Sequence, residues 1–364
     1  MSQNNLLIPF FGLKRQYKNL REELLDASDR VYTSGQVLDG DYTRIFQQEI
    51  AKRCDRQFAI AVNSCTQGLI MAMQAIQETT IAIPAVSFAA TINSVLMTTH
   101  TPKFVDVDYN GLMDLSMLDT TDVGAVMYAN LFGNTIDYDK FRIMTEFFGR
   151  DIKTIEDAAQ SFGASYKGIP SGKMGYVSVL SFDPTKNLPN YGSGGMILTD
   201  DFDLATDLMD LRDNGKLSNH TFPGTNSKMS ESDCAQMLVK LRHFDKWQER
   251  RAEIAEYYFQ NLYDMVDVLT PNADVKHAWH KFVMRVPQRH KLAESLASHG
   301  IETKKHYTFP LTDLEVSQPY VDSDLYVYIG AENFCRESLS LPIYPELTDG
   351  EVERIVKSIR DFYR

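Results

Sequence analysis

The stretch Val177-Ser-Val-Leu-Ser-Phe-Asp-Pro-Thr-Lys186-Asn-Leu-Pro-Asn-Tyr-Gly-Ser-Gly-Gly-Met196 decides the fold and the chemistry that this sequence predicts. Its first residues form a short apolar run rich in valine, which is typical of a buried strand. The run ends at the turn signal Asp183-Pro184, and Lys186 follows. A glycine-rich segment at 192–195 then leads into a second apolar run. The pattern predicts a lysine on a turn between two strands, where backbone can come close to a ligand.

A lone lysine is more often a solvated surface residue, but two features favour a reactive lysine here. Ser181 stands five residues before Lys186 and can donate a hydrogen bond to a phosphate. Glu156-Asp157-Ala-Ala-Gln160 closes an earlier predicted strand. A lysine amine that attacks a carbonyl, an acid that keeps a pyridine nitrogen protonated, and a phosphate site together describe the chemistry of pyridoxal 5'-phosphate (PLP).

Three motifs in this order resemble those of the DegT/DnrJ/EryC1/StrS sugar aminotransferase family: E-D-A-A-Q at 156–160, S-F-x-P-T-K-N-L at 181–188 and G-x-G-G at 192–195. The likeness runs from Ile8 to Pro345. It implies an α/β fold, the fold-type-I PLP-dependent transferase, with a mostly parallel seven-stranded sheet sandwiched by helices and a smaller C-terminal α/β domain. We expect the large PLP-binding domain at 1–240 and the small domain at 241–364.

The repeated strand, loop and helix pattern independently predicts a mostly parallel sheet with polar residues at the carboxyl ends of its strands. Beyond the segments already named, strands are expected at 58–62, 81–84, 103–108, 152–157 and 279–286, and a strand with its loop at 125–133. Helices are expected at 17–27, 41–54, 69–76, 138–148, 204–212, 231–264 and 291–299.

The composition limits the class of protein. The chain has 364 residues, of which 43% are hydrophobic and 24% charged, as in soluble globular proteins. A formal net charge of -12 argues against a nucleic-acid partner. No apolar run reaches membrane-spanning length and the start lacks the features of a signal peptide, so we expect a cytoplasmic protein without a membrane partner. The four cysteines form no CxxC motif, and we expect free thiols and no metal site.

A candidate phosphate site follows the predicted strand at 58–62. Ser64, Cys65 and Thr66 lie in a small polar turn before a helix, and the free N–H groups of a helix start favour an anion. Ordinary capping by Ser64 or Thr66 is the alternative. The family usually has S-G-T-x-A here, so Cys65 departs from its pattern. Binding through backbone N–H groups still works if Cys65 needs no positive φ.

The resemblance implies further cofactor contacts. Phe88 would stack on the pyridine face, a core phenylalanine being the alternative. Asp157 would face the ring nitrogen, Gln160 the ring hydroxyl oxygen and Ser181 the phosphate, and Glu156 would support the turn.

Residues 224–229 resemble the family motif G-x-N-Y-R-M. Asn226 would reach across a homodimer to the partner's cofactor phosphate, so that the two active sites are shared. Ser227 and Lys228 replace the tyrosine and arginine of that motif. A loop asparagine without a ligand is the alternative.

The candidate substrate residues lie in two places. Most relatives have histidine where this chain has Asn130, which suggests a different substrate. Lys304 and Lys305 could meet an anionic part of the substrate, unless they are a solvated pair. His306 and Tyr307 fit an H-Y pair on a site-facing turn, although a core or surface histidine is as good an explanation.

These features together predict a PLP-dependent aminotransferase with Lys186 as its catalytic residue. It would move the amino group of L-glutamate onto a keto or aldehyde carbon of a sugar, for cell-surface polysaccharide or lipopolysaccharide. The acceptor in the family is most often a nucleotide-linked keto-deoxysugar. The alternative is the 8-oxo form of 3-deoxy-octulosonate, a free sugar acid that would give 8-amino-3,8-dideoxy-octulosonate (amino-Kdo), because the N-terminal third is similar to that branch.

The sequence does not have the features expected of two other classes of protein. A nucleotide-dependent oxidoreductase would need G-x-G-x-x-G after the first strand, and residues 63–68 do not provide it. A non-catalytic binding protein on this fold should lack Lys186 or Asp157, and both are present.

Overall fold

A seven-stranded sheet forms the centre of the computed structural model, which describes residues 7–76, 79–146, 152–321 and 328–364. In spatial order its strands are β1 (Phe58–Val62), β9 (Gly195–Thr199), β8 (Val177–Ser181), β5 (Lys153–Asp157), β4 (Ala125–Ala129), β2 (Thr80–Pro84) and β3 (Thr101–Val105). Strand β9 is antiparallel to both of its neighbours, and the pairs β8–β5, β5–β4, β4–β2 and β2–β3 are parallel. The predicted mostly parallel sheet is confirmed.

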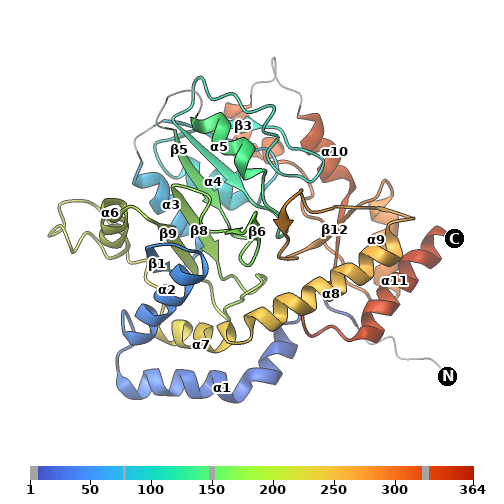
Figure 1. Ribbon diagram of the computed structural model, residues 1–364, viewed down its shortest axis with the longest axis horizontal. Helices are drawn as coiled ribbons and strands as arrows, with labels where there is room; N and C mark the ends of the chain where they lie inside the picture. Colours follow the sequence, from blue (N-terminus) through green and yellow to red (C-terminus); the bar gives the residue numbers. More distant parts are fainter. Residues whose placement is uncertain (1–6, 77–78, 147–151, 322–327) are drawn as a thin grey trace.

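Helices cover both faces of this sheet (Figure 1). Those of the described chain are α1 (Leu13–Ser34), α2 (Asp41–Arg53), α3 (Cys65–Gln74), α4 (Ala89–Leu96), α5 (Tyr138–Glu146), α6 (Phe202–Arg212), α7 (Glu231–Leu241), α8 (Phe244–Leu262), α9 (Arg289–Ser298), α10 (Ile329–Glu337) and α11 (Asp349–Tyr363), with the 3₁₀ turns η1 (Leu311–Asp313) and η2 (Glu315–Tyr320). The predicted end of the helix at 138–148 lies outside the described residues.

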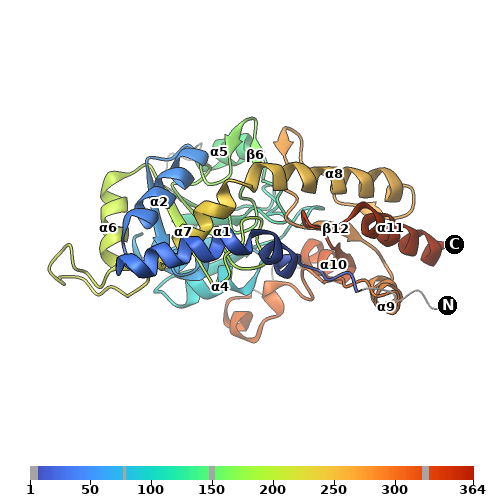
Figure 2. The ribbon, with the colours of Figure 1, turned by 90° about the horizontal axis from the view of Figure 1, so that it is seen from below.

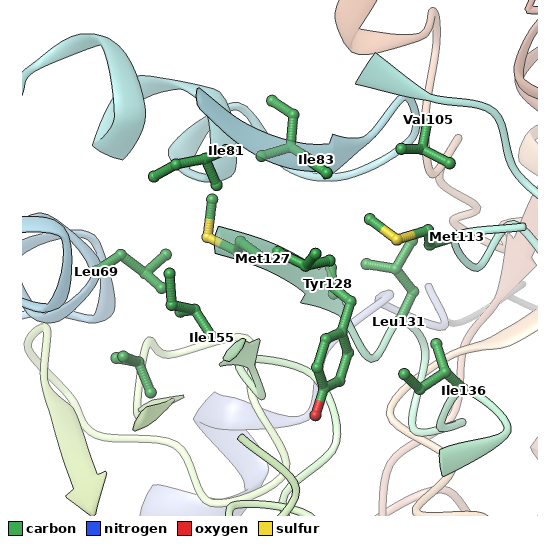
Figure 3. Packing of buried hydrophobic residues seen from close by; sticks show 14 of the residues in the cluster. Leu69, Ile81, Ile83, Val105, Met113, Met127, Tyr128, Leu131, Ile136 and Ile155 are labelled. Atoms are coloured by element: carbon green, nitrogen blue, oxygen red, sulfur yellow. The ribbon is translucent and has the colours of Figure 1, made fainter. Parts of the chain in front are cut away.

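The central strands are apolar along their whole length because both of their faces are buried. Every residue of β4, β8 and β9 is buried. Figure 3 shows the two faces at β4: Met127 lies near Ile81 and Leu69, whereas the ring of Tyr128 points the other way. The Tyr128 ring packs edge-on against Phe141 of α5, with 4.6 Å between ring centroids. Branched and aromatic side chains of this kind stabilise a strand by packing on its neighbours.

Close packing of α3 on the sheet fixes where that helix begins. A Cβ atom on Gly68 would lie 2.8 Å from Cγ1 of Val179 on β8, so only glycine permits this approach. The first turn of α3 therefore sits directly at the carboxyl end of β1.

A second core lies beside the sheet. Its strands are β10 (Asp267–Val268), β12 (Phe282–Arg285) and β13 (Ser338–Leu341), and it is covered by α8, α9 and α11. Ile8 is fully buried in this core and pairs in parallel with Ile301. Figures 1 and 2 show α8 running from the large sheet to these C-terminal elements. The division between residues 240 and 241 stays a prediction.

The predicted single helix at 231–264 is wrong, because α7 ends at Leu241 and α8 begins at Phe244. Met237 and Leu241 pack in a core on the large sheet, whereas Ile254 and Tyr258 pack in the second core. One straight helix presents one apolar stripe, so the break between α7 and α8 lets each half face its own core.

The remaining short strands form a separate three-stranded sheet from β11 (Val275–Lys276), β6 (Ser165–Tyr166) and β7 (Ile169–Pro170). In the described ranges no helix has the length and apolar character needed to span a bilayer. Nor do those ranges hold a cluster of three His, Cys, Asp or Glu side chains arranged for a metal ion. All four cysteines are buried and unpaired with one another, as expected.

Candidate active site

The predicted site residues gather at one edge of the large sheet. Parallel strands bring their carboxyl ends to a common edge, where ligands bind in open α/β sheets. Five predicted residues stand at or just after such ends: Ser64 after β1, Phe88 after β2, Asn130 after β4, Asp157 on β5 and Ser181 on β8. The reversed strand β9 begins at this edge, because Gly195 pairs with both Val62 and Ser181.

Lys186 lies on a tight turn just beyond β8. The Lys186 N–H donates to the Asp183 carbonyl oxygen at 2.9 Å, and the Asp183 carboxylate accepts from the N–H and hydroxyl of Thr185. The Lys186 ammonium has no hydrogen bond or ion pair with any residue that the structure describes. Burial lowers the pKa of Lys186, and the groups of Cys65, Asp157 and Asp183 oppose this. A less protonated amine is the better nucleophile.

Asp157 is a buried carboxylate with a fixed orientation. Its side chain is 7% exposed. One carboxylate oxygen accepts from the Thr91 hydroxyl at 3.0 Å and the other from the Ala159 N–H at 3.1 Å. Burial raises the pKa of Asp157, while these two hydrogen bonds and Lys186 act in the opposite direction. A cation placed against this carboxylate would keep it ionised, as a protonated ring nitrogen does.

The start of α3 has the features of an anion site. Ser64 caps the helix, because its hydroxyl accepts from the Gln67 N–H at 3.1 Å. Cys65 is not among the residues with positive φ, so its departure from the family's glycine brings no backbone strain. The N–H groups of Cys65 and Thr66 are in the first turn, where a helix offers them no internal acceptor. Burial raises the pKa of the Cys65 thiol well above its usual value, so Cys65 adds no negative charge.

These three parts fit the cofactor that the sequence predicts. An unpaired amine, a buried oriented carboxylate and an anion-binding helix start are the donor set that PLP needs for its aldehyde, its ring nitrogen and its phosphate. The three parts lie at or just after the ends of strands β1, β5 and β8, whose carboxyl ends lie at the same edge of the sheet.

Glu156 supports the turn behind the site, as predicted. It is fully buried and accepts from the N–H groups of Gly172 and Met174 and from the hydroxyls of Ser171 and Ser178.

Asn130 belongs to the same network. Its amide nitrogen donates to Glu156 at 2.9 Å and its amide oxygen accepts from the Ile136 N–H at 3.0 Å. Asn130 is 0% exposed, so contact with a substrate would require this network to open.

Gln160 joins Tyr307 to a histidine that the sequence analysis missed. Its amide nitrogen donates to the Tyr307 hydroxyl at 2.6 Å, and its amide oxygen lies 3.2 Å from Nδ1 of His280. The other ring nitrogen of His280 lies 3.2 Å from the carbonyl oxygen of Thr185, next to Lys186. Burial lowers the pKa of His280 well below its usual value, and a neutral imidazole donates only one of these contacts. The run Trp279-His-Lys-Phe indicated only a strand, so His280 was not identified from the sequence as a site residue.

The two lysines predicted as a pair have different surroundings. The Lys304 ammonium lies 5.0 Å from the ring centroid of Phe11, whereas the Lys305 ammonium lies 3.1 Å from Nδ1 of His290 on α9. His306, the next residue, contacts the Ser340 hydroxyl at 2.8 Å through Nδ1. Of the two lysines, only Lys304 therefore lies with the N-terminal aromatic residues.

Phe88 and Asn226 are both open to solvent in the single chain. Phe88 is 60% exposed, so the alternative of a core phenylalanine is wrong. Asn226 is exposed, and the residues beside it lie against the start of α3 in their own chain. The Gln67 side chain donates to the Thr225 hydroxyl at 3.3 Å, and the Asn63 N–H donates to the Ser227 carbonyl oxygen at 2.8 Å. The reach of Asn226 to a partner's phosphate stays a prediction.

The matches to known proteins of similar sequence extend over nearly the whole of this chain. The profile of the DegT/DnrJ/EryC1/StrS aminotransferase family matches residues 18–360. The chain is 32% identical over 374 residues to the pleiotropic regulatory protein of Geobacillus stearothermophilus, covering 98% of this chain and 99% of that protein. It is 32% identical over 368 residues to the dTDP-3-amino-3,4,6-trideoxy-alpha-D-glucose transaminase of Streptomyces venezuelae, covering 98% and 96%. Identity to the UDP-2-acetamido-2-deoxy-3-oxo-D-glucuronate aminotransferase of Pseudomonas aeruginosa is 28%, covering 97% and 99%.

Solved structures agree with the sequence relatives. The crystal structure of DesV from S. venezuelae matches with a TM-score of 0.94 at 31% identity and covers 99% of both chains. NtdA from Bacillus subtilis, solved with its bound cofactor PMP, matches with a TM-score of 0.88 at 23% identity, which shows a shared fold. The profile match and the relatives above 30% identity fix the family. The chain belongs to the DegT/DnrJ/EryC1/StrS family of sugar aminotransferases, enzymes of fold type I that use PLP.

Proposed function

We propose that this enzyme takes the amino group of L-glutamate and transfers it to the keto carbon of a nucleotide-linked sugar, as a cytoplasmic homodimer serving cell-surface polysaccharide synthesis. The observation that carries the proposal is the unpaired amine of Lys186 at the sheet edge, beside Asp157 and the start of α3. The names of the relatives support the acceptor class, since those from S. venezuelae and P. aeruginosa are named for dTDP-linked and UDP-linked sugars.

Different side chains of this site would bind the cofactor and move the proton. When bound, PLP supplies an electron-withdrawing ring that makes the carbon next to the substrate nitrogen acidic. The Lys186 amine would take the proton from that carbon and give it to the other carbon bound to the same nitrogen, a task suited to an amine whose pKa burial has lowered. Asp157, held by Thr91 and Ala159, would keep the ring nitrogen protonated. The start of α3 would hold the phosphate of the cofactor.

An acceptor screen tests this function directly. The holoenzyme is incubated with ¹⁵N-labelled L-glutamate and a panel of dTDP-, UDP- and GDP-linked keto-sugars, and the products are analysed by mass spectrometry. We expect ¹⁵N in an amino sugar that still carries its nucleotide. Absence of label from every nucleotide-linked acceptor, with label released from glutamate, would contradict the acceptor class.

A free sugar acid is the second candidate acceptor, represented by the 8-oxo form of 3-deoxy-octulosonate. The observation that favours it is a cationic region near Lys186 that could hold a carboxylate, described below. Labelling of this compound in the same screen would select it over the nucleotide-linked sugars.

A further inference from the structure

Lys281 is a buried lysine close to the N-terminal segment. It stands immediately before β12 and is 5% exposed. Its ammonium group makes no hydrogen bond and no ion pair with any residue in the described ranges. Its contacts are aromatic: the ammonium nitrogen lies 4.5 Å from the ring centroid of Phe11 and 5.3 Å from that of Phe10. Such contacts hold an ammonium group in place but leave its charge unneutralised.

A second lysine approaches the same two rings. The Lys304 ammonium lies 5.0 Å from the centroid of Phe11 and 5.8 Å from that of Phe10. The two rings pack edge to face at 4.8 Å. The N-terminal aromatic pair therefore contacts two lysines, one before β12 and one after α9.

Most of the charged groups that act on Lys281 are basic. Burial lowers the pKa of Lys281 well below its usual value, and Lys186, Arg251 and Lys304 lower it further, whereas Asp183 acts in the opposite direction. The Arg251 guanidinium donates to the carbonyl oxygens of Trp279 and Ile343.

Two other carboxylates lie near this region: Glu302 accepts from the Phe10 N–H and Glu346 acts on Arg251, but no described carboxylate forms an ion pair with Lys281 or Lys304. The Asp183 carboxylate already accepts from Thr185. Burial, first among the causes, lowers the pKa of His280 and of His306 well below the usual value, so both histidines are neutral. A chain with a net charge of -12 thus gathers basic side chains here, and Lys281 follows His280, whose Nε2 lies 3.2 Å from the Thr185 carbonyl oxygen next to Lys186.

We propose that Lys281 and Lys304 bind a carboxylate group of a substrate that reacts at Lys186. A buried ammonium without a counter-charge is costly, and a carboxylate between the two lysines would offset that cost. The cofactor phosphate has its own place at the start of α3, so this region is left for a substrate. The inference rests on the proposed function, which supplies one carboxylate source in L-glutamate and a second in an acid sugar.

The first test measures the donor half-reaction alone. Holoenzyme is mixed rapidly with L-glutamate without an acceptor, and the change in cofactor absorbance gives the apparent Kd and the limiting rate. Because a charged hydrogen bond is lost, Lys281→Met should raise the Kd for glutamate by about 10- to 100-fold, with a limiting rate within roughly threefold of wild type. Lys304→Met should have a smaller effect because Lys304 is exposed. Lys291→Met, an exposed lysine of α9, is the matched control.

The second test separates a donor carboxylate from an acceptor carboxylate and from a phosphate. Calorimetry measures binding of UDP-glucuronate and of UDP-glucose, which differ in one carboxylate. If Lys281→Met weakens the binding of glutamate but not of the two nucleotide sugars, the region binds the donor carboxylate. Weaker binding of UDP-glucuronate but not UDP-glucose assigns it to an acid sugar. Equal losses for both nucleotide sugars assign it to a diphosphate and overturn the proposal, as does an unchanged affinity for all three compounds.

Two further measurements keep the result interpretable. Lys281→Gln, together with the thermal midpoint and cofactor absorbance of each variant, distinguishes lost binding from lost folding. Glutarate binding by calorimetry tests the region even if the wild type transfers no amine from glutamate, in which case the donor proposal fails alone. A wild type that binds none of glutamate, glutarate and UDP-glucuronate overturns the carboxylate site.

Discussion

The hydroxyl of Thr91 donates a hydrogen bond of 3.0 Å to the carboxylate of Asp157, which joins the first turn of α4 to the end of β5. Thr91 is itself fully buried and lies 2.7 Å from the Ser87 hydroxyl. Because the Ala159 N–H holds the other carboxylate oxygen, the orientation of Asp157 is set before any ligand arrives. Preorganised charge of this kind needs no rearrangement during the reaction.

Replacing Asp157 with Asn should therefore lower turnover by on the order of 10²- to 10³-fold, because it removes the charge at nearly constant volume. Steady-state kcat and the cofactor absorbance spectrum measure this. The folded pKa of Asp157 is raised by burial, so wild-type protein without cofactor loses stability as the pH rises from the ordinary carboxyl pKa through that raised value. At neutral pH the Asn variant without cofactor should unfold at no lower temperature than wild type. Near wild-type turnover in Asp157→Asn would show that Asp157 is not the partner of the ring nitrogen.

Lys186 should be the attachment point of the cofactor. We expect borohydride reduction of the holoenzyme, followed by proteolysis and mass spectrometry, to place the cofactor on Lys186 because its amine is half-buried and unpaired among the described residues. Lys186→Ala should still bind PLP at the start of α3 but should not turn over. Label on another lysine, or on none, would refute this assignment.

Lys240 should make stability depend on pH above neutrality. This lysine of α7 is fully buried, donates to the Pro189 carbonyl oxygen and lies 3.5 Å from the ring centroid of Tyr191, so it holds the loop after Lys186. Burial lowers its pKa to about 7, with Asp233 and Glu346 opposing. An unfolded lysine keeps its proton to about pH 10, so the unfolded chain binds more protons between these values. The free energy of unfolding should then rise with pH, by at most about 1.4 kcal/mol per pH unit from this group.

Urea unfolding at pH 7.5, 8.5 and 9.5 measures that slope. Wild type should gain stability over Lys240→Met across this series, because the variant lacks the titrating group. Comparing the two proteins cancels the contributions of other lysines. Parallel pH profiles would show that Lys240 does not titrate in this range.

Mixed dimers should reveal which subunit Asn226 serves. A carboxylate in Asn226→Asp would repel the cofactor phosphate, and Lys186→Ala lacks the reactive amine, so each homodimer should be inactive. If Asn226 acts across a two-fold dimer, the mixed dimer has one site with both defects and one site with neither, and activity returns on mixing. If it serves its own chain, next to Thr225 and Gln67, every site keeps one defect. Native mass spectrometry confirms subunit exchange, and no recovery after exchange excludes the shared site.

The sequence was sufficient for the large sheet because its strands are buried on both faces and read as apolar runs that end in polar residues. The same rule placed Ser64, Asp157 and Ser181 at one edge. The prediction from apolar spacing failed at Arg242 and His243. The spacing of apolar residues there does not indicate that α7 and α8 pack in different cores. Lys281 was hidden for another reason: its role depends on Phe10 and Phe11, which only the folded chain brings near.

The contact between the Phe10 N–H and the Glu302 carboxylate, 2.8 Å long, joins residues 292 positions apart. Beside it, Ile8 exchanges backbone hydrogen bonds with Gly300 and Glu302. A ribosome makes Ile8 and Phe10 long before these partners exist. During synthesis this apolar segment must therefore stay exposed to solvent while most of the chain emerges. The second core can form only near the end of translation. A chain released before residue 302 would expose the segment to aggregation or to chaperones, and the aromatic pair would not yet hold Lys281 and Lys304.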